Sequence, residues 1–270
     1  LQKLGAGTLT LGGTNTFTGT TTISEGVLRA GGSNVFASGG PIAIGAGATL
    51  DLNGFNHTLN ALSGTGGIAL GGATLTTGTD GGSLTIGGVI SGSGSLVKEG
   101  AGTLTLTGAN TYSGGTTVGD GILLGTTTSL QGNILNNARV VFDQGFNGTY
   151  AGSMSGTGIL EKAGIGILTL TGTNTYSGGT VITGGSIVGT TASLAGTIVN
   201  NSALTFGGSN DGTFFGTIGG GGSLNKIGSS TMTLNGFHPF NGVTTVSQGT
   251  LELNGTLGGT VIVGPDGTLL

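Results

Sequence analysis

One phrase occurs four times in this 270-residue chain, and each copy begins at a lysine. The four lysines, Lys3, Lys98, Lys162 and Lys226, are separated by 95, 64 and 64 residues. After each lysine the same landmarks follow: a large apolar residue six positions later, an aromatic residue at fourteen and glycine at twenty-three. Asparagine stands at position twelve in three copies and histidine in the fourth. Repetition at a fixed period indicates an array of similar units, so this feature limits the possible folds more than any other.

Within each unit, apolar residues alternate with threonine or glycine, as at Leu104 and Leu106 or Leu168 and Leu170. Alternation with a period of two is typical of a β-strand. Gly-Gly and Asn-Gly pairs separate these short runs and favour tight corners. The 65 glycines also disfavour helix. The sequence therefore predicts an all-β fold of many short strands with a corner between each.

The unequal repeat lengths favour an open β-helix, or β-solenoid, over a closed propeller, which needs equal blades. A coil of about 21 residues per turn accommodates 64 residues as about three turns, and the extra residues of the first unit as one or two added turns. We predict a single β-helix segment with repeat units 1–95, 96–159, 160–223 and 224–270, the last truncated. Because the chain begins at leucine and its last unit stops partway, we expect an open fragment of a longer array.

The composition excludes several classes of function. Six basic residues are too few to neutralise a nucleic-acid backbone. The chain has no cysteine, and therefore no disulfide, zinc-thiolate cluster or thiol nucleophile. No run of apolar residues approaches the length of about twenty that a membrane-spanning helix needs. We expect no metal and no cofactor.

The repeated landmarks are the main candidates for specific roles. Their asparagines suit glycine-rich corners, and their aromatic rings suit either corner packing or, as the alternative, the stacking of sugars. The spacing of about three turns is sparse for a sugar-binding row, so a structural role is predicted. The predicted structural positions are Asn15, Phe17, Asn110, Tyr112, Asn174, Tyr176, His238 and Phe240.

The remaining polar residues offer little for catalysis. The candidates for an acid and base pair are Asp51 with His57, Asp211 and His238. Gly119-Asp120-Gly121 is the candidate for a serine-protease nucleophile motif, and Gly207 to Gly212 is the candidate for a calcium loop. Lys98-Glu99 and Glu161-Lys162 are the candidates for surface ion pairs. The first set forms no convincing pair, the triplet lacks a serine after Asp120, and calcium-binding turns would repeat the aspartate. The adjacent opposite charges are predicted to be solvated surface pairs. Alternating threonines, as at Thr103 and Thr105, resemble ice-binding arrays but appear once per unit.

The phrase from Gly100 to Thr117 resembles the passenger-associated transport repeat of bacterial autotransporters. It recurs from Gly164 to Val181, and more loosely from Gly5 to Thr22 and from Gly228 to Thr245. The resemblance implies a right-handed parallel β-helix in a passenger that is exported across the outer membrane to the cell surface or secreted. It also implies an outer-membrane β-barrel of the same polypeptide as the export partner. The fourth copy departs from the pattern, with His238 for asparagine and Pro239 for threonine.

We therefore predict a structural extracellular stalk whose repeats assist export and folding, with neighbouring turns as its principal partners and no enzymatic activity. One alternative is an adhesin segment whose corner loops bind host surfaces, other cells or polymers. A second alternative is a polysaccharide-active β-helix enzyme.

Overall fold

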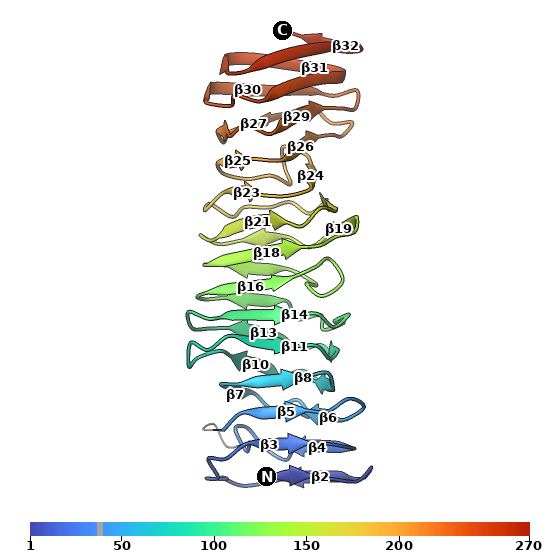
Figure 1. Cartoon of the computed structure of the whole chain (residues 1–270), viewed down its shortest axis with the longest axis vertical. Helices are drawn as coiled ribbons and strands as arrows, with labels where there is room; N and C mark the ends of the chain where they lie inside the picture. Colours follow the sequence, from blue (N-terminus) through green and yellow to red (C-terminus); the bar gives the residue numbers. More distant parts are fainter. Residues whose placement is uncertain (37–39) are drawn as a thin grey trace. The chain divides into compact units, whose positions relative to one another are not determined.

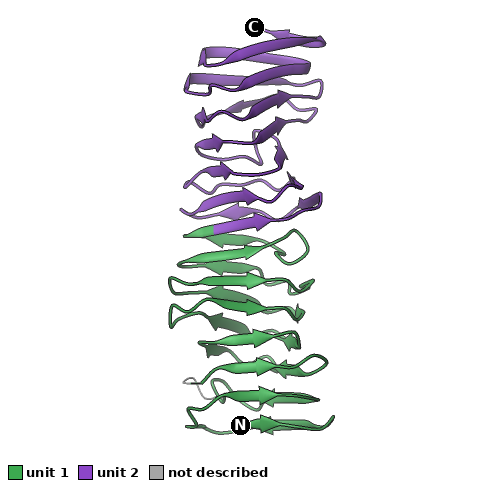
Figure 2. Cartoon of the chain, viewed as in Figure 1, with its two compact units in different colours: residues 1–139 green, residues 140–270 purple. Residues whose placement is uncertain are grey.

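The computed structural model describes residues 1–36 and 40–270, and every regular element in them is a β-strand (Figure 1). The chain divides into two compact units, unit 1 with residues 1–139 and unit 2 with residues 140–270 (Figure 2). The boundary between them lies inside the predicted repeat unit 96–159, and the predicted repeat bounds stay a prediction.

In unit 1 the strands form three parallel sheets, with the strands of each sheet stacked in chain order (Figure 1). The first sheet holds β1 (Gln2–Lys3), β3 (Thr21–Ile23), β5 (Ile42–Ile44), β8 (Leu62–Gly64), β11 (Leu84–Ile86), β14 (Thr103–Leu106) and β16 (Ile122–Gly125). The second holds β2 (Thr8–Leu11), β4 (Val27–Ala30), β6 (Thr49–Asp51), β9 (Gly67–Ala69) and β12 (Ile90–Ser91). The third holds β7 (His57–Leu59), β10 (Thr74–Thr77), β13 (Ser95–Lys98), β15 (Thr116–Val118) and β17 (Ile134–Asn136).

Unit 2 repeats this arrangement, and its last strands are long enough to pass around corners. The first sheet holds β18 (Arg139–Asp143), β21 (Ile159–Ala163), β23 (Thr180–Ile182), β25 (Ile198–Asn200) and β28 (Ile218–Gly219). The second holds β19 (Gly148–Tyr150), β22 (Ile167–Leu170), β24 (Ser186–Gly189), β26 (Ala203–Phe206), β29 (Ser223–Lys226) and the first part of β31 (Val243–Leu257). Through the long β31 this sheet continues around the corner into β30 (Thr231–His238) and β27 (Gly212–Phe214), which take the place of a third sheet, and β32 (Thr260–Leu269) pairs with both parts of β31. A further short strand is β20 (Met154–Ser155).

The register shows that each turn of the chain stacks on the one before it. In unit 1, Lys3, Ile23, Ile44, Gly64 and Ile86 are successive parallel partners. Partners on neighbouring turns lie between 17 residues apart, as for Val243 and Thr260, and 22 apart, as for Gly64 and Ile86. The predicted fold class, an all-β parallel β-helix, is confirmed.

The core consists of apolar columns in which one residue of each turn lies above its counterpart. Inward-facing residues alternate with exposed ones because the strand period is two, and aligned partners therefore stack inside the coil. The buried columns on the second sheets are Leu28, Leu50, Ile68 and Ile90 in unit 1, and Leu168, Ile187, Leu204 and Leu224 in unit 2. A single turn contributes few such residues, so stability depends on stacking.

The repeat and the turn have different lengths, which corrects one expectation. In unit 2, Leu160, Thr180, Ile198 and Ile218 are successive partners, so three turns take 58 residues, from 160 to 218. The 64-residue repeat exceeds three turns by six residues, which moves the next copy onto the following sheet. Lys162 accordingly lies on β21 in the first sheet, and Lys226 lies on β29 in the second.

Lys3 and Lys98 of unit 1 also lie on different sheets. Four turns lead from Lys3 to Ile86, and Lys98 follows twelve residues later, on β13 of the third sheet. A repeat that ends at a corner can begin on any sheet, because all three sheets are built from the same short strands.

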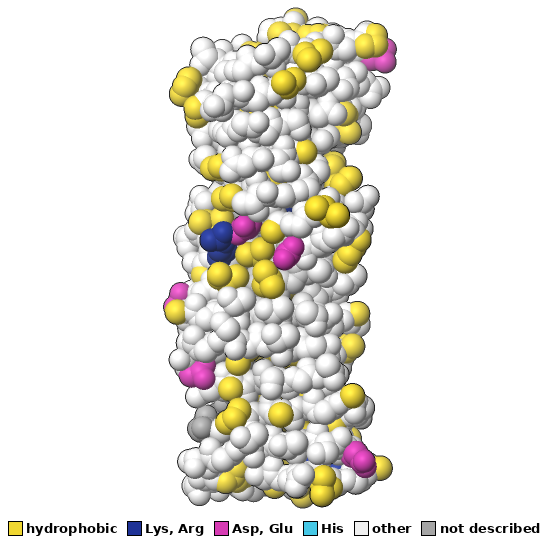
Figure 3. Space-filling view, in the orientation of Figure 1, with side chains coloured by type: hydrophobic (Ala, Val, Ile, Leu, Met, Phe, Trp, Pro, Cys, Tyr) yellow, Lys and Arg dark blue, Asp and Glu magenta, His cyan; other side chains and the backbone are white. Residues whose placement is uncertain are grey.

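The surface carries little charge. Figure 3 shows acidic and basic side chains as a few separate patches on the visible face. Within residues 1–36 and 40–270, no helix is long and apolar enough to cross a membrane.

Candidate functional site: the repeated lysine corner

The lysine that begins each repeat closes the corner at the end of its strand. Nζ of Lys98 donates to three backbone carbonyl oxygens, those of Glu99 (2.8 Å), Gly100 (2.6 Å) and Asp120 (3.2 Å). The first two belong to the same corner, and Asp120 belongs to the next turn. An ammonium group has three N–H donors and no acceptor, so the three carbonyls satisfy it completely.

The other three lysines make the same set of bonds. Each Nζ donates to the carbonyls one, two and twenty-two residues later. These are Leu4 (3.0 Å), Gly5 (2.5 Å) and Glu25 (3.0 Å) for Lys3; Ala163, Gly164 (2.8 Å) and Gly184 (3.5 Å) for Lys162; and Ile227 (3.0 Å), Gly228 (2.8 Å) and Gln248 (3.2 Å) for Lys226. The same hydrogen-bonded corner therefore occurs in all four repeats.

Burial of these lysines overturns one prediction. The side chains of Lys98 and Lys162 are 0% exposed, so Lys98-Glu99 and Glu161-Lys162 are not solvated surface pairs. Burial lowers the pKa of Lys98, because loss of water disfavours the ammonium, and the charges of Asp120 and Glu99 oppose that shift. The pKa of Lys162 and of Lys226 is lowered by burial in the same way. The sequence pattern of adjacent charges misled because it contained no information about the inward strand position.

Glycine is required where the next turn passes the lysine corner. Gly185 has a φ of 62°, and a Cβ there would lie 2.6 Å from the carbonyl oxygen of Gly164. Gly121 has a φ of 68° and faces the carbonyl of Gly100 in the same manner. Both the left-handed backbone and the close approach exclude a larger residue.

The landmark asparagine links three successive turns. Oδ1 of Asn110 accepts the N–H of Ile90 in the preceding turn (2.8 Å), and its Nδ2 donates to the carbonyl of Ser129 in the next (2.8 Å). Asn174 does the same with the N–H of Met154 (2.6 Å) and the carbonyl of Ser193 (2.6 Å). We call this two-sided bond the asparagine staple.

The first and fourth copies carry weaker versions of the staple. In the first, Nδ2 of Asn15 donates to the carbonyl of Val35 (2.8 Å). In the fourth, Nδ1 of His238 accepts the N–H of Ile218 (3.1 Å). His238 Nε2 is buried and has no hydrogen-bond partner within the described part of the chain. Burial lowers the pKa of His238.

The landmark aromatic rings of the last three copies lie inside the coil. Tyr112, Tyr176 and Phe240 are buried, and only Phe17 is partly exposed. The hydroxyls of Tyr112 and Tyr176 share hydrogen bonds with Oγ1 of Thr116 (2.6 Å) and Thr180 (2.7 Å), four residues later. Burial raises the pKa of both tyrosines. Stacking of sugars on these three rings is ruled out by their burial, and the assignment of all eight landmark positions to structural roles stays a prediction.

The polar residues singled out for catalysis do not converge. Asp51 forms an ion pair with Arg29 (2.7 Å), whereas His57 is buried and stacks on Phe36, with ring centroids 4.7 Å apart. Oδ1 of Asp211 accepts the N–H of Thr231 (2.6 Å). In the described residues, no group of three or more His, Cys, Asp or Glu side chains is placed to hold a metal ion.

The Gly119-Asp120-Gly121 triplet belongs to the lysine corner of the second copy. Oδ1 of Asp120 accepts the N–H of Gly121 (2.7 Å), and its backbone carbonyl accepts from Lys98. The Gly207 to Gly212 segment connects β26 with β27, and its aspartate is the one that bonds Thr231. These contacts are those of corners and loops.

Sequence reasoning missed the lysine corner, although one signal pointed to it. Every lysine of the chain is a repeat lysine, while the two arginines, Arg29 and Arg139, fall outside the pattern. A charge that recurs only at the structural period indicates a structural requirement for an ammonium group.

Comparison with known proteins identifies these repeats. The pattern of the passenger-associated-transport-repeat family matches residues 1–30, 96–124, 160–188 and 224–253. The chain is also similar to the Adhesin BmaC autotransporter of Brucella suis biovar 1 (strain 1330), with 47% identity over 132 residues. That match covers 46% of this chain and only 4% of the relative. No solved structure matches the chain significantly.

Each matched range begins two residues before a repeat lysine. It contains the landmark asparagine or histidine, the landmark aromatic residue and the glycine that stands twenty-three positions after the lysine. A region of this kind belongs to a protein exported across the outer membrane and either displayed at the cell surface or secreted. The chain therefore carries four passenger-associated transport repeats, and over 46% of its length it is similar to a bacterial autotransporter.

Proposed function

We propose that this segment is a structural stalk of the passenger, and that its repeats lock successive turns together as the passenger is exported and folds. The observation that carries the proposal is the lysine corner, which joins two turns through one fully satisfied ammonium in all four copies. Outside the outer membrane no nucleotide drives transport. The free energy released when a turn stacks therefore opposes its return through the translocator.

The export partner in this proposal is the outer-membrane β-barrel of the same polypeptide, and the permanent partners are the neighbouring turns. Lysine corners and asparagine staples direct their donors to the following turn, so each turn contributes bonds that a detached turn lacks. The proposal includes no catalytic step, no cofactor and no nucleic acid.

Deletions that keep or break the register test the stalk proposal. Removing residues 160–223 joins Ile159 to Leu224 and places Lys226 where Lys162 had been, so the chain continues in register. Removing residues 160–220 leaves three more residues, which turns inward side chains outward. In the full parent protein, we expect the first deletion to reach the cell surface and the second to stall or be degraded. Equal surface accessibility to protease, at equal synthesis, would contradict the proposal.

Adhesion is a second candidate function. It is favoured by the name of the relative, an adhesin, and by an open hollow beside an exposed phenylalanine in unit 2. A stalk with a binding site on one corner performs both functions. Loss of binding by a variant that is still exported would separate the two.

A further inference from the structure

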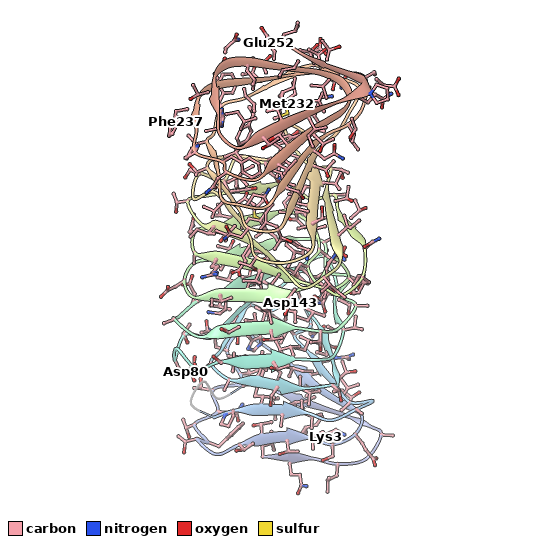
Figure 4. All side chains as sticks on the ribbon, turned by 45° about the horizontal axis from the view of Figure 1, so that its top comes forward. Lys3, Asp80, Asp143, Met232, Phe237 and Glu252 are labelled. Carbon is pink, nitrogen blue, oxygen red and sulfur yellow. The ribbon has the colours of Figure 1, made fainter. Side chains whose placement is uncertain are left out.

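The two most exposed phenylalanine rings of unit 2 are not repeat aromatics. Phe215 is 89% exposed and Phe237 is 67% exposed. Figure 4 shows Phe237 projecting away from the ribbon, whereas Met232 of the same strand lies within the coil. Phe214 pairs with Leu234 in register, so Phe237 lies on the turn next to Phe215 and two positions farther along. The two rings therefore offer exposed aromatic surface on adjacent turns.

A hollow of about 290 Å³ lies beside Phe215. Three successive turns line it, and none of the lining side chains is charged. Its lining includes Thr173, Asn174, Thr191, Leu194, Ala195 and Phe215. The hollow is at the lower end of the size range for small-ligand sites, and threonine hydroxyls and backbone groups supply polar contacts.

The loop that forms the floor of the hollow is held in place without a ligand. Ser193 Oγ accepts the N–H of Thr190 (2.7 Å), and the carbonyl of Thr190 accepts the N–H of Leu194 (3.1 Å). The asparagine staple of Asn174 binds the carbonyl of Ser193 from the preceding turn (2.6 Å). A loop that is already ordered loses little conformational entropy when a ligand binds.

We infer that this hollow and the Phe215 ring form a binding site for a neutral saccharide. The inference deepens the adhesin candidate and rests on it. A sugar presents an apolar C–H face to an aromatic ring and hydroxyls to the adjoining polar groups, which matches a ring at the rim of an uncharged hollow. A carboxylated or sulfated polymer would find no cationic side chain here, because no lysine or arginine of the described residues lines the hollow. The ammonium group of Lys226 already donates its three N–H groups to backbone carbonyls. Phe237 provides a second ring on the adjacent turn for a longer chain of sugars.

The second repeat copy contains the same frame without these features. At the position of Ala195 it has Gln131, and at the position of Phe215 it has Ala151, each 64 residues earlier. Nε2 of Gln131 donates to the carbonyls of Thr127 (3.0 Å) and Thr128 (3.2 Å), so this side chain folds back over its own loop. The natural sequence thereby supplies a double substitution, Ala195→Gln with Phe215→Ala, that the fold accepts.

The test measures binding of the whole chain to laminarin, galactomannan and soluble cello-oligosaccharides, with polygalacturonate and hyaluronate as acidic comparisons. We expect a neutral saccharide to bind, and the Ala195→Gln/Phe215→Ala variant to bind it at least about tenfold more weakly. Phe146→Ala, which removes another exposed ring outside the hollow, should bind as the wild type does. Far-UV circular dichroism and melting should be unchanged in both variants.

Four results would overturn the inference: no binding to any of the neutral saccharides, equal binding by the double variant, an equal loss in Phe146→Ala, or tighter binding of the acidic polymers. Surface display of the double variant in the parent protein separates this inference from the stalk proposal. Normal display with lost binding supports the saccharide site and leaves the stalk untouched. Equal surface display of the two register deletions would contradict the stalk proposal and would leave the binding result unaffected.

Discussion

The third and fourth repeat copies lie in the same compact unit and share the lysine corner, yet they differ in how they tie turns together. Lys162 and Lys226 each bind three carbonyls of two turns. Twelve residues later, Asn174 makes two hydrogen bonds to flanking turns, whereas His238 makes one. The corner is constant and the staple varies.

The path of the backbone explains the difference. Within the third copy, a loop between β24 and β25 interrupts the ladder, and the carbonyl of Ser193 in this loop needs a side-chain donor. In the fourth copy, β30 and β31 pair without a break from Thr231 with Thr250 to His238 with Leu257. Where backbone ladders run through a corner they already satisfy the polar groups, and one side-chain acceptor is enough. The staple is thus needed where the ladder breaks, and the lysine corner is needed everywhere.

The largest expected effect is loss of a lysine corner. Lys162→Met and Lys226→Met each remove an ammonium and leave buried carbonyls without their donor, so each should lower the free energy of unfolding by about 3 to 5 kcal/mol. Urea unfolding followed by circular dichroism would measure this. Arg29→Met, which breaks an ion pair in which the arginine side chain is 45% exposed, is the control and should cost less than about 1 kcal/mol. A markedly smaller effect at Lys226 than at Lys162 would show that the corner is not constant.

Removal of the staple should distinguish the two copies. Asn174→Ala deletes two bonds that link three turns and should cost about 2 to 3 kcal/mol, whereas His238→Phe, which deletes one bond and keeps a ring in the buried position, should cost about 1 kcal/mol. The same unfolding measurement applies, and Asn110→Ala should match Asn174→Ala because its two bonds are equivalent. If the histidine variant proved as unstable as the asparagine variants, the ladder would not be compensating for the missing bond.

Much of this fold could be predicted because local rules and the repeat agree. Alternation at Leu168 and Leu170 and glycines at corners such as Gly185 specify strands and turns without knowledge of distant contacts. The burial of Lys98 and Lys162 could not be predicted from adjacent charges, because the decisive partners are backbone carbonyls, one of them 22 residues away. The sequence specifies side chains but does not indicate which backbone carbonyls will lie within hydrogen-bonding distance of a lysine.

The candidate binding site was equally hidden. Phe215 is not a repeat residue, and its exposure follows from standing next to Phe214, which occupies the inward position on β27. The aromatic residues that recur at the repeat period, such as Tyr176 and Phe240, were the sequence candidates, and these are residues that the coil buries. In a repeat protein of this kind, residues that depart from the repeat are the better candidates for ligand contact.

Acidification should affect the fourth copy and leave the third unchanged. Burial holds the pKa of His238 below its ordinary value of about 6.5, so as pH falls the unfolded chain takes up the proton first. The free energy of unfolding should be constant above about pH 7 and fall progressively as the pH drops below the ordinary histidine pKa of about 6.5. His57, whose pKa burial lowers to about 4, titrates in the same direction, so the measurement uses a His57→Phe background. Adding His238→Asn to that background should flatten the profile, and an unchanged slope would assign the titration to another group.

The smallest effect concerns one hydroxyl, and it should have opposite signs in the two copies. Tyr176 and Thr180 share a buried hydrogen bond (2.7 Å). At the equivalent positions of the fourth copy stand Phe240 and Thr244, and Oγ1 of Thr244 is buried with no partner among the residues that the structure describes. Tyr176→Phe should therefore lower the free energy of unfolding by about 1 kcal/mol, while Phe240→Tyr should raise it by a similar amount.

Thermal unfolding would resolve both changes as shifts of about 2 to 4 °C in opposite directions. The double variant Phe240→Tyr with Thr244→Val is the control, because it removes the acceptor and should lose the gain. The gain depends on the Phe240 ring lying over Thr244 as the Tyr176 ring lies over Thr180. A lower melting temperature for Phe240→Tyr would mean that the continuous strands of the fourth copy have closed the space for the hydroxyl, and that the two corners differ in packing as well as in bonding.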